Sequence, residues 1–147
     1  MTDAIDDAPA LSAITYDELV VGKRIGPFEE RVTADLAGRL AGPIGEPRTV
    51  AAAPPAVFPV LFLRALRRGL GGIPAGGILA KQELEFHAPL AVGTTAQVTM
   101  WIGAKEVRRE RPFVTVEFDV RDAHGVQAVS GRKVIVWPTG PGQEAGR

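Results

Sequence analysis

The sequence contains no cysteine at all, so disulfide bonds and metal sites built on thiolates are excluded. It also has no excess of charge, because 17 Lys and Arg residues balance 17 Asp and Glu residues. Nucleic-acid-binding domains usually carry a basic excess or a basic stripe, so this class of protein is not predicted. The absence of cysteine fits a cytoplasmic protein, and the cytoplasm is the compartment that we expect.

No apolar run is long enough to cross a bilayer, which takes about 20 residues in a helix. The longest run, Val50 to Leu63, is broken by three prolines and is followed by arginines. The stretch MTDAIDDAPALSA at the start is acidic and has no positive region followed by an apolar core. We therefore expect neither a membrane span nor a secretory signal peptide.

What the sequence does contain is enough apolar material for one core. Its 147 residues suit a single domain, and 46% of them are hydrophobic. We predict a folded domain over residues 14–137. The arm at 1–13 and the tail at 138–147 are rich in small and polar residues, so both are predicted to be disordered.

The first half of the predicted domain holds short elements. We expect a helical turn at Tyr16 to Val21, followed by a strand at Ile25 to Val32, in which Pro27 marks either an edge strand or the start of a strand. Thr33 is a good N-cap for a short helix over Ala34 to Ala41.

The element expected to carry the core is a helix over Ala56 to Leu70. It is apolar almost all round at its start, which is typical of a buried helix. We expect Leu61, Leu63 and Leu66 to lie in the core.

The second half alternates between apolar and polar residues, which predicts strands. Four strands are expected, at Ile78 to Phe86, Thr95 to Val107, Phe113 to Val120 and Val126 to Trp137. One apolar helix on one face of an antiparallel sheet is an α+β architecture.

Particular positions in these strands carry further predictions. The alternation places Ala104 on the inner face, together with a set on the next strand: Val114, Val116, Phe118 and Val120. Asp122 to Gly125 predicts a hairpin turn with the glycine in the left-handed conformation. Gly131 interrupts the last strand and predicts a β-bulge.

Three stretches resemble the MaoC-like dehydratases. One is IPAGGILAKQELEFHAPLAVGTTAQVTMWIGAKEVRRERPFVTVEFDVRDAHG, with Phe86, Pro89-Leu90, Gly93 and Gly125 at the family's strand ends and turns. YDELVVGKRIGPFEERVTADLAGRLAG resembles the family's opening, and APPAVFPVLFLRA resembles the central helix of its N-terminal, substrate-side domain. The resemblance implies a hotdog fold, in which an antiparallel sheet wraps around a central apolar helix.

The chain departs from this family at the catalytic segment. Catalytic members carry an Asp and a His five residues apart, within Gly-Asp-x-Asn-Pro-x-His. The matching segment, AGPIGEPRTVAAAPP, has neither residue, and Glu46 is its single carboxylate. Hydration of an enoyl thioester needs a base for the proton and a group that holds the water, which one carboxylate does not easily supply.

The resemblance therefore implies the non-catalytic subunit of a two-subunit (R)-3-hydroxyacyl-thioester dehydratase. Such a subunit has no catalytic residue, metal or cofactor of its own. Its ligand is an acyl-CoA or acyl-carrier-protein thioester of fatty acid metabolism. Its partner is a second hotdog subunit that carries the Asp/His pair, with a self-dimer as the other possibility.

Two other functions stay open at this point. One is a stand-alone hotdog thioesterase with Glu46 as a lone catalytic acid, although Gly45 and Pro47 favour a solvated loop charge there. The other is a non-enzymatic acyl-thioester binding or assembly protein. His87 lies on the polar face of a predicted strand, which favours a surface or interface histidine over a general base.

The candidate substrate-binding residues surround the predicted central helix. They are Pro55, Phe58, Phe62, Arg64, Arg67 and Arg68. The apolar members suit the wall of an acyl tunnel, with core packing as the competing interpretation. The arginines suit phosphates of the carrier arm, although arginines near a helix end also complement the helix dipole.

Overall fold

The computed structural model describes residues 14–40 and 52–138 of the chain. Residues 1–13 and 139–147, which belong to the predicted arm and tail, lie outside this part. So does the segment 41–51, which includes Glu46.

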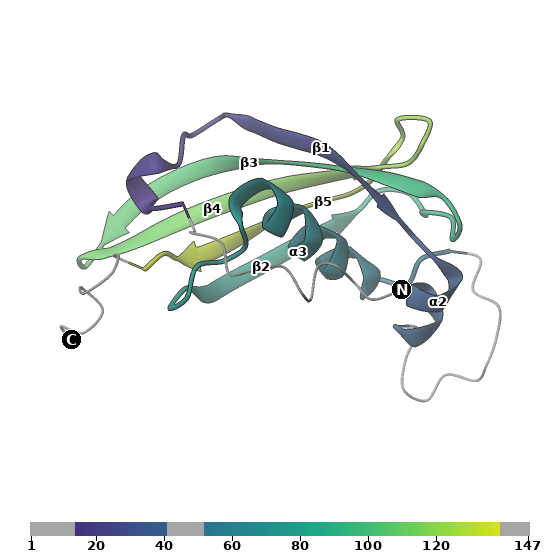
Figure 1. The fold of residues 1–147 in the computed structure, drawn as a ribbon, viewed down its shortest axis with the longest axis horizontal. Helices are drawn as coiled ribbons and strands as arrows, with labels where there is room; N and C mark the ends of the chain where they lie inside the picture. Colours follow the sequence, from purple (N-terminus) through teal and green to yellow (C-terminus); the bar gives the residue numbers. More distant parts are fainter. Residues whose placement is uncertain (1–13, 41–51, 139–147) are drawn as a thin grey trace.

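The described residues form one five-stranded antiparallel sheet (Figure 1). Its strands are β1 (Arg24–Arg31), β2 (Ile78–Phe86), β3 (Thr95–Arg108), β4 (Arg111–Arg121) and β5 (Gln127–Val136). Their order across the sheet is β1-β3-β4-β5-β2, so β1 and β2 are the two edges. The placement of β1 at an edge confirms the prediction from Pro27.

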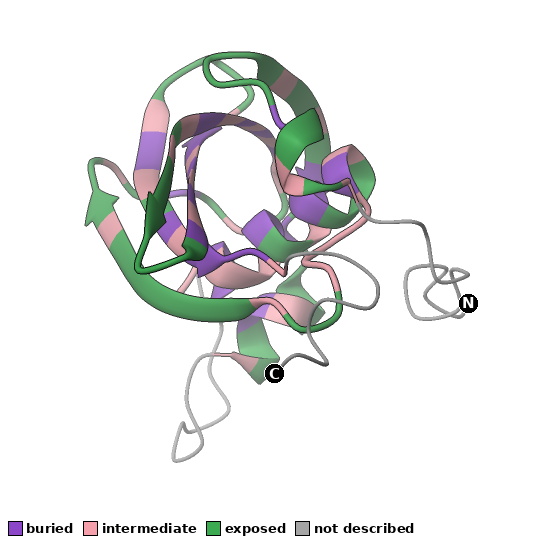
Figure 2. Ribbon diagram, turned by 90° about the vertical axis from the view of Figure 1, so that its left-hand side faces the viewer, coloured by how far each residue is buried: buried purple, intermediate pink, exposed green. Residues whose placement is uncertain are grey.

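Three helical elements accompany the sheet: η1 (Tyr16–Glu18), α2 (Ala34–Arg39) and α3 (Val57–Leu70). The side chain of Thr33 caps α2 by accepting a hydrogen bond of 3.0 Å from the Leu36 amide. Gly71 ends α3 with a φ of 79°, a conformation that favours glycine. The sheet curves around α3 (Figures 1 and 2).

The core lies between α3 and the concave face of the sheet (Figure 2). The predicted phase of β4 is confirmed by a set of residues that are 0–1% exposed: Val114, Val116, Phe118 and Val120. From the helix, Leu61 and Leu66 meet this layer and are fully buried.

Leu63, Ala104 and Gly131 do not behave as predicted. Leu63 is 47% exposed, because the buried stripe of α3 runs through its neighbours Leu61, Phe62 and Leu66 instead. Ala104 is exposed, because the register of β3 against β4 shifts between Ile102 and Ala104 and reverses the alternation.

Gly131 does not form a bulge. It pairs with Phe118 on one side and Leu84 on the other, with no register shift at either pair. A Cβ at this position would lie 2.7 Å from both the Phe118 ring and the Glu83 carbonyl oxygen. Glycine is therefore required here because the Phe118 ring lies directly against the backbone of β5.

The edge strand β2 is the least covered strand of the sheet. It pairs with β5 on one side, and no described strand pairs with its other side. Its apolar residues Ile78, Leu79 and Phe86 are 51%, 46% and 52% exposed. An exposed apolar edge of this kind is a surface suited to pairing with another chain.

Candidate functional site

A cavity of about 310 Å³ opens between the start of α3 and the end of β2. Its wall is mostly apolar and consists of Ala53, Pro55, Phe58, Phe86, His87, Ala88, Pro89 and Leu90. Phe58 and Phe86 meet edge to face, with ring centroids 5.7 Å apart. A site of this size and lining suits an apolar chain rather than a charged group.

The proline pair before α3 positions this wall. The Pro54 carbonyl accepts a hydrogen bond from the Val57 amide, and the Pro55 carbonyl accepts one from the Phe58 amide. These two bonds begin the helix and hold Phe58 at the mouth of the cavity. The Ala53 amide donates to the Leu90 carbonyl at 2.7 Å, which ties the segment before α3 to the segment that follows β2.

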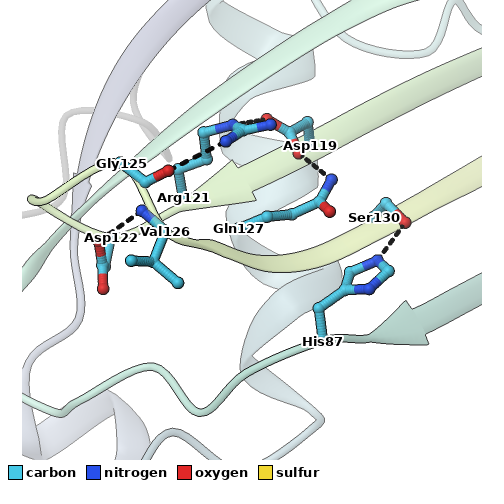
Figure 3. Close-up of polar contacts among 8 residues, drawn as sticks. All are labelled: His87, Asp119, Arg121, Asp122, Gly125, Val126, Gln127 and Ser130. Atoms are coloured by element: carbon cyan, nitrogen blue, oxygen red, sulfur yellow. Dashed lines mark hydrogen bonds and ion pairs between the residues drawn. The ribbon is translucent and has the colours of Figure 1, made fainter.

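Among the described residues, His87 is the one titratable side chain in the wall of this cavity. Its Nε2 lies 2.8 Å from the Ser130 hydroxyl on β5, and its amide donates to the Ala128 carbonyl (Figure 3). In residues 14–40 and 52–138, no carboxylate is hydrogen bonded to its ring. A hydroxyl group that could act as a nucleophile therefore lies beside an imidazole that could act as a base. The described residues do not supply the third group that orients the base in a catalytic triad.

A second polar network lies near this pair, at the β4–β5 hairpin (Figure 3). Asp119 accepts from Arg121 at 2.7 Å and also accepts from the Gln127 amide group. Asp122 accepts from the backbone amides of His124 and Val126, and these bonds hold its pKa below the ordinary value. These hydrogen bonds satisfy backbone amides of the hairpin turn that the sequence predicts. Gly125 has a φ of 86° in this turn. His124 is therefore a turn residue.

Phe62 lies deeper than the cavity, in the core beneath it. Its side chain is fully buried, and its ring centroid is 4.4 Å from that of Phe118. The ammonium group of Lys133 lies 4.7 Å from the same ring centroid. Lys133 is only 3% exposed, and this burial lowers the pKa of its ammonium group.

Two of the three candidate arginines hold a buried carboxylate on β1. Glu30 is 4% exposed, and its oxygens lie 3.2 Å from Arg68 and 3.9 Å from Arg64. Burial raises the pKa of Glu30, while the two guanidinium groups oppose that rise. Arg68 also donates to the Glu29 carbonyl at 3.0 Å. These contacts join α3 to β1, so Arg64 and Arg68 have a structural role. Arg67 is exposed on the same helix.

Sequence reasoning did not single out Glu30 or Lys133. Both sit in strands where the residues two positions away are apolar or glycine: Phe28 and Val32 flank Glu30, and Gly131 and Ile135 flank Lys133. Alternate residues of a strand point to the same face, so a charged residue between apolar neighbours two positions away is predicted to point inward. This alternation could have identified both residues from the sequence. The described residues contain no cluster of three or more His, Asp or Glu side chains that could hold a metal ion. They also contain no helix that is long and apolar enough to span a membrane.

No protein-family model matches the sequence, and no curated protein matches it. Solved structures do match the fold. A MaoC-like dehydratase from Rhodospirillum rubrum superposes with a TM-score of 0.69 at 22% identity, over 84% of this chain and 97% of that one. This chain has the hotdog fold. The prediction of an α+β hotdog architecture is confirmed by this match.

Two other solved structures also match the fold. The HadBC (3R-hydroxyacyl-ACP dehydratase) complex from Mycobacterium tuberculosis matches with a TM-score of 0.62 at 15% identity, over 78% of this chain and 95% of that one. A thioesterase superfamily member from Thermus thermophilus matches with a TM-score of 0.63 at 19% identity, over 82% and 85% of the two chains. At these identities the likeness establishes the fold and not the reaction.

Proposed function

We propose that this hotdog protein is the accessory, substrate-binding subunit of an (R)-specific enoyl-thioester hydratase or 3-hydroxyacyl-thioester dehydratase of fatty acid metabolism. The observation that carries the proposal is a mismatch. The apolar cavity at the start of α3 is present, whereas the sequence of the adjoining segment, residues 41–55, has neither the Asp nor the His of the catalytic pattern. In this proposal the chain has the cavity for an acyl chain but lacks the Asp/His pair that carries out the acid–base chemistry in catalytic members.

The ligand in this proposal is an acyl-CoA or acyl-carrier-protein thioester. Pro55 and Phe58 line the cavity and contact the acyl chain, and Phe62 forms the packed layer behind them. Arg67, with Arg64 and Arg68 beside it, supplies positive charge for the phosphates of the carrier arm. Arg64 and Arg68 contact Glu30, and Arg67 is exposed on the same helix.

The partner is a second hotdog subunit that carries the catalytic Asp and His. The free edge of β2, with three half-exposed apolar residues, supports pairing with another sheet. The likeness to the HadBC complex, whose name describes a 3R-hydroxyacyl-ACP dehydratase, supports a partner of this kind. A self-dimer would use the same edge.

The test is co-expression with a hotdog protein that contains Gly-Asp-x-Asn-Pro-x-His and is encoded beside this chain. We expect the two to co-purify and to hydrate crotonyl-type thioesters together. The activity should vanish when the partner's Asp and His are replaced, because only the partner supplies the acid–base pair. The purified chain alone should show no measurable hydration.

Three outcomes would contradict the proposal. Hydration by the lone chain at a turnover number in the usual enzyme range, roughly 1 to 1000 per second, would make it a complete enzyme. Thioester cleavage by the lone chain would instead favour the thioesterase function. Thioester binding without any activity or hotdog partner would favour a non-enzymatic binding protein.

A further inference from the structure

Lys133 is a buried ammonium group without a counter-charge among the described residues. It is 3% exposed, and no carboxylate in residues 14–40 or 52–138 forms an ion pair with it. Its ammonium nitrogen lies over the Phe62 ring, 4.7 Å from the ring centroid. A cation–π contact with one ring replaces only a small part of the hydration that a buried lysine loses. The described residues therefore leave the charge of Lys133 uncompensated, and an anion beside it would be favourable.

Lys133 contacts α3, the helix whose first turn forms one wall of the cavity. It lies on β5, one strand in from the β2 edge, and pairs in register with Gln82 on β2 and Val116 on β4. Register partners share one face of a sheet, so the exposed Gln82 adds an amide donor beside the ammonium group. Phe62, which the ammonium group contacts, lies one helical turn beyond Phe58 of the cavity wall.

The spacing of Phe58 and Phe62 along α3 indicates how long a ligand must be to reach Lys133. Phe58 and Phe62 are four residues apart on α3, which corresponds to about 6 Å along a helix. An acyl chain that enters at the cavity and follows α3 for one turn would bring its distal carbon atoms close to Lys133.

We propose that Lys133 binds a carboxylate at the distal end of a short acyl chain, so that the preferred ligand is a thioester of a dicarboxylic acid. This inference rests on the proposed function, because it assumes that the acyl chain occupies the cavity at the start of α3. Lys133 would donate to the carboxylate, with Gln82 as a second donor from the edge strand. A carboxylate there would give the ammonium group a charge-assisted partner, which residues 14–40 and 52–138 do not provide.

The experiment compares two probes of equal chain length, adipyl-CoA and hexanoyl-CoA, by calorimetric titration of the native protein and its partner complex. We expect adipyl-CoA to bind about tenfold more tightly than hexanoyl-CoA. Lys133→Met keeps the length of the side chain and removes its charge, so the preference should disappear in this variant. Lys81→Met is the matched control, because Lys81 is exposed on β2 and its loss should leave the preference unchanged.

The outcomes separate this inference from the proposed function. If both thioesters bind but adipyl-CoA has no advantage, or if Lys133→Met keeps the advantage, the inference is overturned and the proposed function stands. If neither thioester binds the native protein or the complex, the proposed function fails and the inference fails with it. If Lys133→Met abolishes assembly with the partner while ligand preference is kept, Lys133 serves a carboxylate of the partner protein and the inference is wrong. Circular dichroism of the variant establishes that it is folded.

Discussion

The ring of Phe62 on α3 lies 4.4 Å from the ring of Phe118 on β4, centroid to centroid, at an interplanar angle of 41°. Both side chains are at most 1% exposed. Phe118 also covers the bare backbone of Gly131 on the neighbouring strand. The pair therefore joins the helix to two adjacent strands at one point in the core.

Phe118→Ala is expected to lower the free energy of unfolding by about 3–5 kcal/mol, because it removes a buried ring and leaves a cavity. Urea denaturation with a two-state fit measures the change. Val107→Ala is the control, since Val107 is 60% exposed at the end of β3, and it should cost no more than about 0.5 kcal/mol. A loss below roughly 1 kcal/mol for Phe118→Ala would mean that this ring does not carry the core.

Glu30 predicts a pH dependence of stability. Its pKa in the folded state is raised above the ordinary value of 4.5, chiefly by burial. The folded protein therefore holds this proton to a higher pH than the unfolded chain, so stability is lost as the pH rises from 4.5 through the raised pKa. Glu30→Gln cannot ionise, so its stability relative to the native protein should increase over that interval.

The measurement for Glu30 is the free energy of unfolding of both proteins at a series of pH values from 4 to 8. Glu29→Gln, an exposed neighbour on β1, should show no such trend. A native protein that gains stability over Glu30→Gln as the pH rises would mean that attraction to Arg68 and Arg64 exceeds the cost of burial.

Lys133 predicts the opposite slope. Burial lowers its pKa below the ordinary value of 10.5, so the unfolded chain keeps its proton to a higher pH than the folded protein. The native protein should gain stability as the pH rises from the lowered pKa towards 10.5. In the absence of ligand, Lys133→Met should be more stable than the native protein at pH 7, and the gap should narrow in alkaline solution. Thermal melts of both proteins at pH 7 to 10 measure this difference in stability. A difference that does not change with pH would mean that the pKa of Lys133 is not lowered by folding.

The three arginines of α3 should separate into two groups. Arg64→Ala and Arg68→Ala remove partners of buried Glu30, so both should lower the melting temperature. Arg67→Ala should weaken acyl-CoA binding to the assembled complex by about 1 kcal/mol or less, a factor of about five, and the effect should shrink at high salt. Unchanged binding across all three variants would remove the phosphate role.

The sequence was informative where one face of an element is buried and the alternation is unbroken. The inward set of β4 from Val114 to Val120 followed directly from its period of two. The cap at Thr33 and the turn at Gly125 followed from side-chain chemistry that acts over three or four residues. The order of the strands and the family of folds rested on the resemblance, because periodicity alone does not determine topology.

The failures have a common physical cause, which is contact between residues far apart in the chain. Gly131 is glycine because Phe118 occupies the space of its side chain, and nothing near Gly131 in the sequence announces this. The exception is the register shift between Ile102 and Ala104, which reverses the phase of β3: it falls at Gly103, and a glycine inside a strand is itself a local signal of a bulge. Of the candidate site, Pro55 and Phe58 line the cavity, whereas the partnership of Arg68 with Glu30 spans 38 positions and was not foreseen.

The uncovered edge of β2 has a consequence for how much of this protein a cell keeps. A chain without a partner displays Ile78, Leu79 and Phe86 on β2, a strand that pairs with β5 and has no described strand on its other side. Quality-control systems recognise such surfaces, and proteases act on chains that open there. If β2 pairs with the proposed partner, excess copies would be removed while assembled copies persist, and the supply of partner would set the abundance of this chain. A single half-exposed strand would in this way match the stoichiometry of two subunits without any dedicated regulator.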